Sequence, residues 1–164
     1  MREQRFDELV RRHGGAVGAY ARAVSRDRWQ AEDAVQETFL RAWKYLDSYD
    51  HRGSFEGWLI RICRNVVIDL AARDTGDLEP LPPEREHPVA PDHRSEVHEL
   101  VALLPLPQRE VLVLCGIIGY DYERAAQILD VPVGTVRSRL SRARAGLADL
   151  LADDAGALDG VRTA

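Results

Sequence analysis

The sequence is short of the residues that build metal sites and disulfide frameworks. It holds two cysteines in 164 residues, Cys63 and Cys115, and each lies inside an apolar run. Neither has a second cysteine or a histidine at a metal-ligand spacing. We therefore expect two buried free thiols, with no metal and no other cofactor.

Long apolar segments and strand-like patterns are also missing. No apolar run approaches the about 20 residues that cross a bilayer, and the segment from Met1 to Phe6 has no apolar signal core. These absences predict a cytoplasmic, reduced protein without membrane insertion. Alternating apolar and polar runs are absent, whereas Ala, Leu, Arg and Glu are abundant. That composition predicts an all-α fold.

The motifs that accompany catalysis are not present either. The sequence has no Gly-rich phosphate loop, no paired-carboxylate signature and no nucleophile motif with its partners. Its five histidines are scattered, and His93 and His98, five residues apart, would not share a helix face. We expect no catalytic residues and a protein that is not an enzyme.

Basic residues are fewer than acidic residues over the whole chain, but the two kinds are unevenly distributed along it. The sequence has 22 basic and 27 acidic residues, for a net charge of −5. Such a charge opposes nucleic-acid binding, so any contact with DNA must come from a local basic face. The distribution of charge therefore carries more information than its sum.

Proline is concentrated in one segment. Five of the eight prolines lie between Asp74 and Ser95, where they remove backbone donors and disfavour helix. This pattern predicts a Pro-rich flexible linker at 74–95 between two small helical domains at 1–73 and 96–151, followed by a flexible acidic tail at 152–164.

Apolar periodicity and capping residues predict four helices on each side of that linker. Before it we expect helices at 5–13, 16–24, 27–46 and 54–73, with Gly14 and Gly15 separating the first two and with Asp27 and Ser54 as N-caps. After it we expect helices at 97–104, 107–115, 122–129 and 133–151, with Asp121 as an N-cap.

The segment from Tyr122 to Arg144 has the layout of a helix-turn-helix. Ala125 and Ala126 permit a close helix crossing, a short turn follows at 130–132, and Val136 and Leu140 face inward. The outward positions of the second helix, which reach base edges or phosphates in this motif, are Thr135, Arg137, Ser138, Ser141 and Arg142. An Arg-rich solvated helix face would explain the charge alone. The turn, the small residues and the charge together favour DNA binding.

This segment resembles region 4.2 of the extracytoplasmic-function sigma factors of bacterial RNA polymerase, with Val131 to Leu140 as the closest match. Residues 104–111 resemble the preceding region 4.1. Asp130 stands where many relatives have Gly, and Asp tolerates a left-handed turn. The resemblance implies recognition of the −35 promoter element by the five outward residues, and docking on the polymerase β flap.

The N-terminal half carries a second resemblance. Residues 31–43 resemble sigma region 2.2, which docks on the β′ clamp helices of the polymerase. The resemblance implies a docking role for residues that share one helix face: Asp33, Gln36, Glu37 and Leu40. Spacing alone would favour an ordinary acidic surface stripe with a tryptophan in the core, and the resemblance to region 2.2 reverses that preference.

The next two segments resemble the parts of sigma region 2 that open the −10 element. Residues 47–59 resemble region 2.3, where a loop receives a flipped base, and Arg52, Ser54 and Phe55 are the candidates. Ser54 can also be simply an N-cap, and Phe55 simply core. Residues 61–69 resemble region 2.4, with Arg61, Arg64, Asn65 and Asp69 as DNA contacts. Leu70, Ala71 and Ala72 stand where relatives often carry basic residues, which predicts either a weaker grip on duplex DNA near the −10 element or a grip supplied by the linker.

Together the resemblances imply an alternative sigma factor. Its expected partners are core RNA polymerase, promoter DNA and an anti-sigma factor, and it would direct initiation by recognising −35 and −10 elements and helping strand separation. The linker leaves no room for a region 3 domain. A stand-alone helix-turn-helix regulator is the alternative, which would bind duplex DNA as a dimer and use its N-terminal half for dimerisation or sensing.

Overall fold

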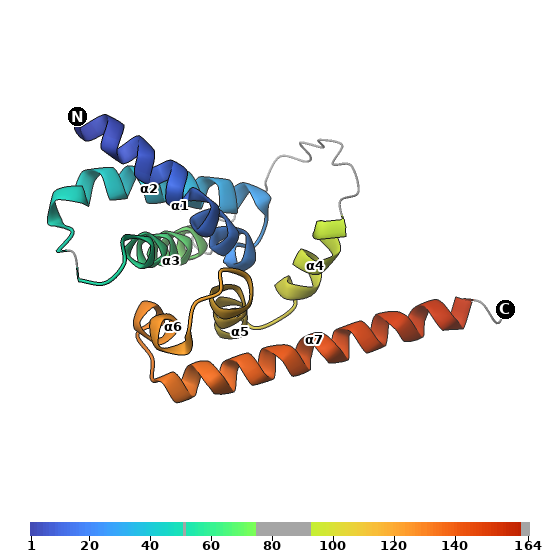
Figure 1. Ribbon diagram of the computed structural model, residues 1–164. Helices are drawn as coiled ribbons and strands as arrows, with labels where there is room; N and C mark the ends of the chain where they lie inside the picture. The colour runs from blue at the N-terminus through green and yellow to red at the C-terminus, as the bar shows by residue number, and fades with distance from the viewer. Residues whose placement is uncertain (51, 75–92, 162–164) are drawn as a thin grey trace. The chain divides into compact units, whose positions relative to one another are not determined.

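The computed structural model describes residues 1–50, 52–74 and 93–161, and the regular elements in these residues are all helices (Figure 1). The chain divides into two compact units, 1–95 and 96–164. Most of the predicted linker lies outside the described residues. Its ends are helical, because Asp74 closes one helix and residues 93–95 open the next.

The first unit is a three-helix bundle of α1 (Arg2–Val24), α2 (Arg28–Tyr45) and α3 (Phe55–Asp74), with a 3-10 turn, η1 (Leu46–Ser48), after α2. Each helix packs against the other two. The predicted break at Gly14 and Gly15 is wrong, since α1 is continuous through both. A glycine inside a helix costs about 1 kcal/mol, and the burial of Val17, Tyr20 and Val24 one and two turns later offsets that cost.

Two predicted N-caps of this unit are confirmed. The Asp27 carboxylate accepts a hydrogen bond from the Gln30 amide at 2.8 Å, and α2 begins there. The Ser54 hydroxyl oxygen accepts from the Gly57 amide at 3.0 Å at the start of α3. Each bond satisfies one of the backbone donors that a helix leaves open at its N-terminus.

The core of the first unit combines small and large side chains. The fully buried hydrophobic residues are Val17, Tyr20, Ala21, Ala34, Ala42, Leu59, Ile60, Cys63 and Val66. Alanines on α2 let the other helices approach closely, while Tyr20 and Leu59 fill the space between them. This close packing holds α2 and α3 as one rigid platform for their outward side chains.

The second unit contains α4 (His93–Ala102), α5 (Leu106–Val111), the π-helix η2 (Leu112–Ile117), α6 (Tyr122–Leu129) and α7 (Val133–Val161). Two helix predictions need correction here. The helix expected at 107–115 is α-helical only to Val111 and then widens into η2. The last helix continues ten residues beyond its expected end at 151, through a segment that contains no proline to interrupt it. The predicted tail is therefore helical as far as Val161.

Two further observations concern the described residues. None of their helices is long and apolar enough to span a membrane. Within the same part of the chain no three His, Cys, Asp or Glu side chains gather as a metal site would require. Cys63 is buried, as predicted, whereas Cys115 is only half-buried.

Candidate nucleic-acid and partner interfaces

A tight turn joins α6 to α7. The Asp121 carboxylate accepts from the Arg124 amide at 2.8 Å and caps α6. Asp130 then ends the helix in the left-handed conformation, with φ 54° and ψ 51°. The Val131 amide donates back to the Ala126 carbonyl at 3.1 Å, so the chain reverses within three residues. This is the turn that the sequence predicts for a helix-turn-helix, and the small residues before it, Ala125 and Ala126, are buried.

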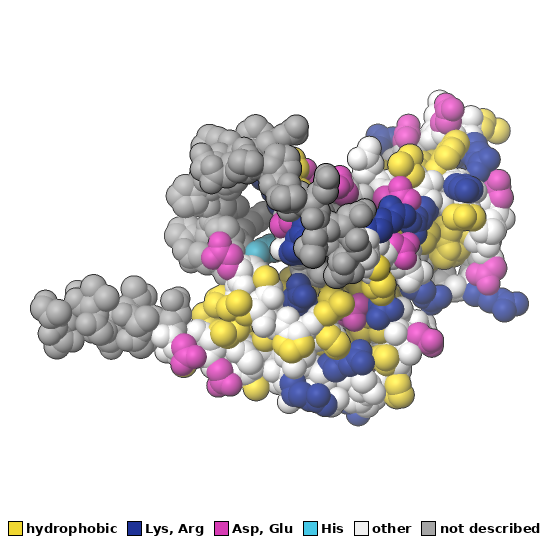
Figure 2. All heavy atoms as spheres, turned by 180° about the vertical axis from the view of Figure 1, so that it is seen from behind, with side chains coloured by type: hydrophobic (Ala, Val, Ile, Leu, Met, Phe, Trp, Pro, Cys, Tyr) yellow, Lys and Arg dark blue, Asp and Glu magenta, His cyan; other side chains and the backbone are white. Residues whose placement is uncertain are grey.

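The N-terminal half of α7 separates an inward from an outward face. Val136 and Leu140 are buried, as predicted. The five predicted DNA-contacting residues lie away from them, with Thr135 half-buried and the others exposed: Arg137, Ser138, Ser141 and Arg142. Figure 2 shows Lys and Arg side chains along this half of α7, with acidic side chains toward its other end. The geometry suits insertion into a major groove.

Aromatic rings hold two arginines beside this face. The Arg137 guanidinium lies 5.8 Å from the ring centroid of Tyr122. Arg124, which the sequence analysis did not single out, lies 4.2 Å from the Tyr120 ring centroid. Cation–π contacts of this kind restrict where an arginine side chain points. The available signal for the second contact was a pair of tyrosines, Tyr120 and Tyr122, that stand four and two residues before Arg124.

One face of α2 is exposed along its length. Asp33 and Gln36 are exposed, and Leu40 is 59% exposed despite being apolar. Trp29, which sequence analysis missed, is 51% exposed and lies on the same face at a helical spacing of three and four residues. Glu37 is only half-exposed and is turned toward a neighbouring arginine. Apolar side chains left in water beside polar ones are typical of a protein-binding surface.

The loop before α3 is built on an aromatic cluster. Phe55 lies 5.3 Å from both Tyr49 and Trp58, measured between ring centroids, and Tyr49 lies 5.2 Å from Trp58. The Tyr49 hydroxyl donates to the Gly53 carbonyl at 2.9 Å, across the turn where Gly53 has φ 90°. All three rings are half-buried. The cluster is therefore a partly open aromatic surface, and Tyr49 is a member that sequence analysis missed.

The side chains of the predicted base-contacting residues of this loop differ in the contacts that they make. Arg52 is exposed, and its guanidinium lies 3.6 Å from the Asp50 carboxylate. Ser54 is engaged as the cap of α3. His13 of α1 lies with its Nδ1 2.9 Å from the Glu56 carboxylate, and its ring centroid lies 5.6 Å from that of Phe55, with the two rings tilted by 52°. The α1 helix thus contacts the residues at the end of the loop, and no local sequence pattern predicted this contact.

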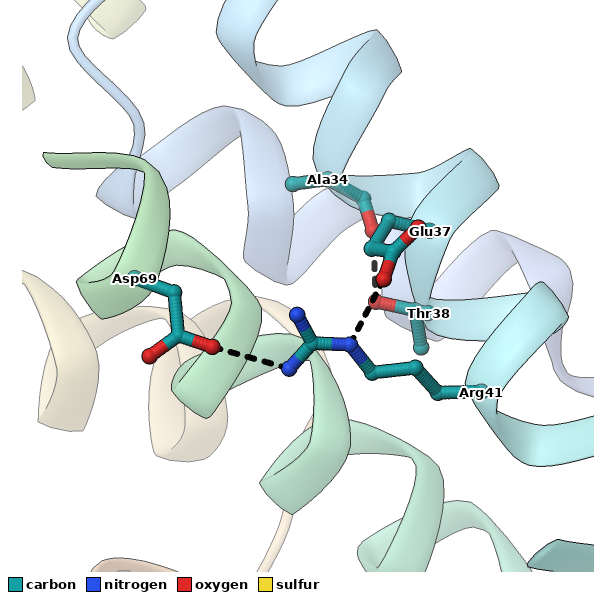
Figure 3. A network of polar contacts seen from close by, with 5 residues as sticks. All are labelled: Ala34, Glu37, Thr38, Arg41 and Asp69. Carbon is teal, nitrogen blue, oxygen red and sulfur yellow. Dashed lines mark hydrogen bonds and ion pairs between the residues drawn. The ribbon is translucent and has the colours of Figure 1, made fainter. Parts of the chain in front are cut away.

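The predicted DNA face of α3 lies at the surface. Arg61, Asn65 and Asp69 are exposed at four-residue steps, and Arg64 is half-buried. Asp69 is not isolated, because the Arg41 guanidinium of α2 donates to its carboxylate at 2.9 Å and to that of Glu37 at 2.7 Å (Figure 3). These two bonds, Glu37 first, raise the pKa of Arg41. Arg41 thereby joins two residues that sequence analysis had assigned to different surfaces.

Comparison with known proteins decides the family. The model of sigma-70 region 2 matches residues 9–76, and that of sigma-70 region 4 matches residues 94–147. The chain belongs to the ECF sigma factors of RNA polymerase. The first match covers the three-helix bundle except the start of α1, and the second covers the helix-turn-helix. The expected order of regions and the all-α fold are both confirmed.

Individual relatives agree with this assignment. This sigma factor is 37% identical to the ECF RNA polymerase sigma factor SigE of Mycolicibacterium smegmatis, covering 90% of this chain and 62% of that protein. It is 34% identical to the sigma factor CnrH of Cupriavidus metallidurans, covering 93% and 89%. The chain thus spans less than two thirds of SigE and most of CnrH.

Two solved structures share the fold. CnrH in complex with the cytosolic domain of CnrY matches with a TM-score of 0.72 at 34% identity, over 93% of this chain and 90% of that one. The sigma factor RpoE of Bartonella quintana, in complex with the anti-sigma factor NepR, matches with a TM-score of 0.76 at 28% identity, over 90% and 97%.

Proposed function

We propose that this sigma factor binds core RNA polymerase through the exposed face of α2 and directs it to promoters with α3 and α7. In this proposal Asp33, Gln36, Glu37 and Leu40 dock on the β′ clamp helices, and region 4 docks on the β flap. The observation that carries it is one chain with an exposed polar–apolar face on α2 and a basic recognition helix in α7. Neither feature is used by the core of its own unit.

Promoter contacts follow from the same assignment. Thr135, Arg137, Ser138, Ser141 and Arg142 would read the −35 element in the major groove. Arg52 and the aromatic cluster of Tyr49, Phe55 and Trp58 would receive an unstacked −10 base, because stacking on a ring is available to every base. Ser54 would stay the cap of α3, and Arg61, Arg64, Asn65 and Asp69 would line the adjacent DNA face. Leu70, Ala71 and Ala72 add no charge there, which favours a weak grip on the duplex.

Three further parts of the proposal concern where the chain works, whether it catalyses a reaction and which protein holds it. The chain would work in the cytoplasm, where its two thiols stay reduced. It would catalyse no reaction itself, since the polymerase performs the chemistry. Because CnrH and RpoE are both held by a partner in their solved complexes, we propose that an anti-sigma factor also holds this chain.

Run-off transcription tests the proposal directly. Bacterial core polymerase, with and without the chain, would transcribe a library of genomic fragments from the organism that carries it. We expect discrete transcripts only when the chain is added, and alignment of their upstream sequences should give both promoter elements. If no transcript appears and the free chain binds a palindromic duplex as a dimer, the helix-turn-helix regulator is the correct function.

A matched pair of variants tests the docking face. Replacing Asp33 and Glu37 with Ala should weaken core binding while the helical circular dichroism stays unchanged. Asp7 and Glu8 on α1 are also exposed acidic residues, and their replacement removes the same charge from another surface. Equal core affinity in the two double variants would show that α2 is not the docking helix.

A further inference from the structure

A single arginine connects the two working surfaces of the first unit. Arg41 lies one turn after Glu37 on α2 and faces Asp69 on α3. Its Nε donates to Glu37 Oε1 at 2.7 Å, and its Nη1 donates to Asp69 Oδ2 at 2.9 Å. Figure 3 shows the guanidinium between the two carboxylates. A planar fork of five N–H donors can serve both at once, which a lysine ammonium does less well.

Stability does not account for this arrangement. The side chains of Arg41, Glu37 and Asp69 are 27%, 41% and 49% exposed, and ion pairs at such exposure contribute little because water and salt screen them. A second ion pair on α2, between Arg28 and Glu32 at 2.8 Å, has the same four-residue spacing, and among the described residues it has no third ion-pair partner. The contact to Asp69 is therefore the distinctive part of the Arg41 network.

The contact between Arg41 and Asp69 matters because of where Asp69 lies on α3. Asp69 follows Arg61 and Asn65 at four-residue steps on the exposed face of α3, the face proposed above to meet the −10 element. An unpaired carboxylate there would repel the phosphates that Arg61 attracts. With Arg41 bonded to it, the carboxylate is turned to α2 and its charge is compensated.

We propose that Arg41 is a positioning residue, which holds the Asp69 carboxylate against α2 and neutralises it so that α3 can approach the promoter. Arg41 thus acts through Asp69, and Asp69 does not read a base. This inference rests on the proposed function, since it takes α3 as the DNA-facing helix. It differs from the family-derived assignment, in which Asp69 itself contacts the −10 element.

A double-mutant cycle separates these roles. Holoenzymes would be made with the full chain carrying Arg41→Ala, Asp69→Ala or both, and the rate of open-complex formation would be measured on a promoter found by run-off transcription. With Asp69 present, Arg41→Ala should slow opening by roughly threefold to tenfold, the range expected when one charge near a phosphate loses its partner. With Ala at 69, Arg41→Ala should change the rate by less than about twofold.

Salt dependence distinguishes an electrostatic defect from a structural one. Between about 0.02 and 0.2 M salt, screening should shrink the ratio of wild-type to Arg41→Ala rates. A misfolded or loosened bundle would keep that ratio constant. Arg28→Ala serves as the control, because it removes an ion pair of the same spacing from the same helix, and it should leave the opening rate within about twofold of wild type.

Three outcomes would overturn the inference. In the first, Arg41→Ala slows open-complex formation equally whether residue 69 is Asp or Ala. In the second, added salt does not reduce the effect of Arg41→Ala on that rate. The third is an Asp69→Ala holoenzyme whose preference among −10 bases changes, since that result would make Asp69 a base-reading residue. Loss of transcription with the unmodified chain would instead refute the proposed function, so the two failures are distinguishable.

Discussion

Gly146 of α7 and Leu104, between α4 and α5, meet where no methyl group fits. A Cβ added at 146 would lie 2.9 Å from Leu104 Cδ2. Leu104 is 5% exposed, so its side chain has little space to move away. The absence of a side chain at 146 therefore allows the chain after α4 to cross closely over α7.

Two glycine-to-alanine substitutions in α7 should have different effects on stability. At Gly134 an added Cβ meets nothing within 4 Å, so Gly134→Ala should raise the free energy of unfolding by up to about 1 kcal/mol through helix propensity. At Gly146 the clash should offset that gain, leaving Gly146→Ala about 1 kcal/mol or more below Gly134→Ala. Urea denaturation measures both. Equal stabilisation by the two would mean that Leu104 adjusts freely.

The Cys63 thiol should make the chain less stable at alkaline pH. Burial raises its pKa from 9.0 to about 11, and a hydrogen bond with Thr38 opposes that change only in part. Above pH 9 the unfolded chain loses this proton before the folded chain does, so the free energy of unfolding falls as pH rises toward 11. The loss from this group should reach about 3 kcal/mol.

A Cys63→Ala variant isolates that effect from the other groups that titrate in the same range. Its free energy of unfolding should fall less steeply than that of the unmodified chain between pH 9 and 11. The native chain should also resist thiol reagents at Cys63, since the thiolate is the reactive form. Rapid labelling of Cys63 in the folded state would contradict the burial that raises its pKa.

Trp29 should contribute to polymerase binding. It is 51% exposed and lies on the α2 face with Asp33, Gln36 and Leu40, and exposed tryptophans that become buried often dominate an interface. Trp29→Ala should weaken core binding by about tenfold or more. Fluorescence anisotropy of a labelled chain titrated with core polymerase would measure this affinity.

Tyr45 provides the matched control for Trp29. It is a 50% exposed aromatic residue on the same helix, but at about 3.6 residues per turn it lies on the opposite side. Tyr45→Ala should leave core affinity nearly unchanged. If both variants bind equally well, Trp29 does not belong to the docking face. If Leu40→Ala also binds normally, the whole face is misassigned.

Arg137 and Arg142 should serve promoter binding and not polymerase binding. Both are exposed on the outward side of α7. Each lost phosphate contact should reduce the slope of log affinity against log salt by about 0.9. Arg12→Ala, which removes an exposed arginine from α1, should leave the slope unchanged in holoenzyme–promoter titrations. A loss of core binding in Arg137→Ala or Arg142→Ala would count against the assignment.

Local signals in the sequence predicted much of the fold. The caps at Asp27, Ser54 and Asp121 were predictable because a side chain three residues before a free amide can satisfy it whatever surrounds it. The left-handed turn at Asp130 follows from the same kind of short-range geometry. The inward positions of α7 were predictable from helical periodicity. By contrast, local signals gave the wrong result at Gly14 and Gly15, where distant packing decided.

The sequence by itself determined that the chain is helical, where most helices begin, and which segments resemble sigma regions 2 and 4. Those properties depend on residues within a few turns of one another. Only the tertiary structure placed Asp69 beside Arg41, His13 beside Glu56 and Leu104 over Gly146. These pairs are 28, 43 and 42 residues apart along the chain. Their proximity depends on how helices pack, and no local spacing encodes it.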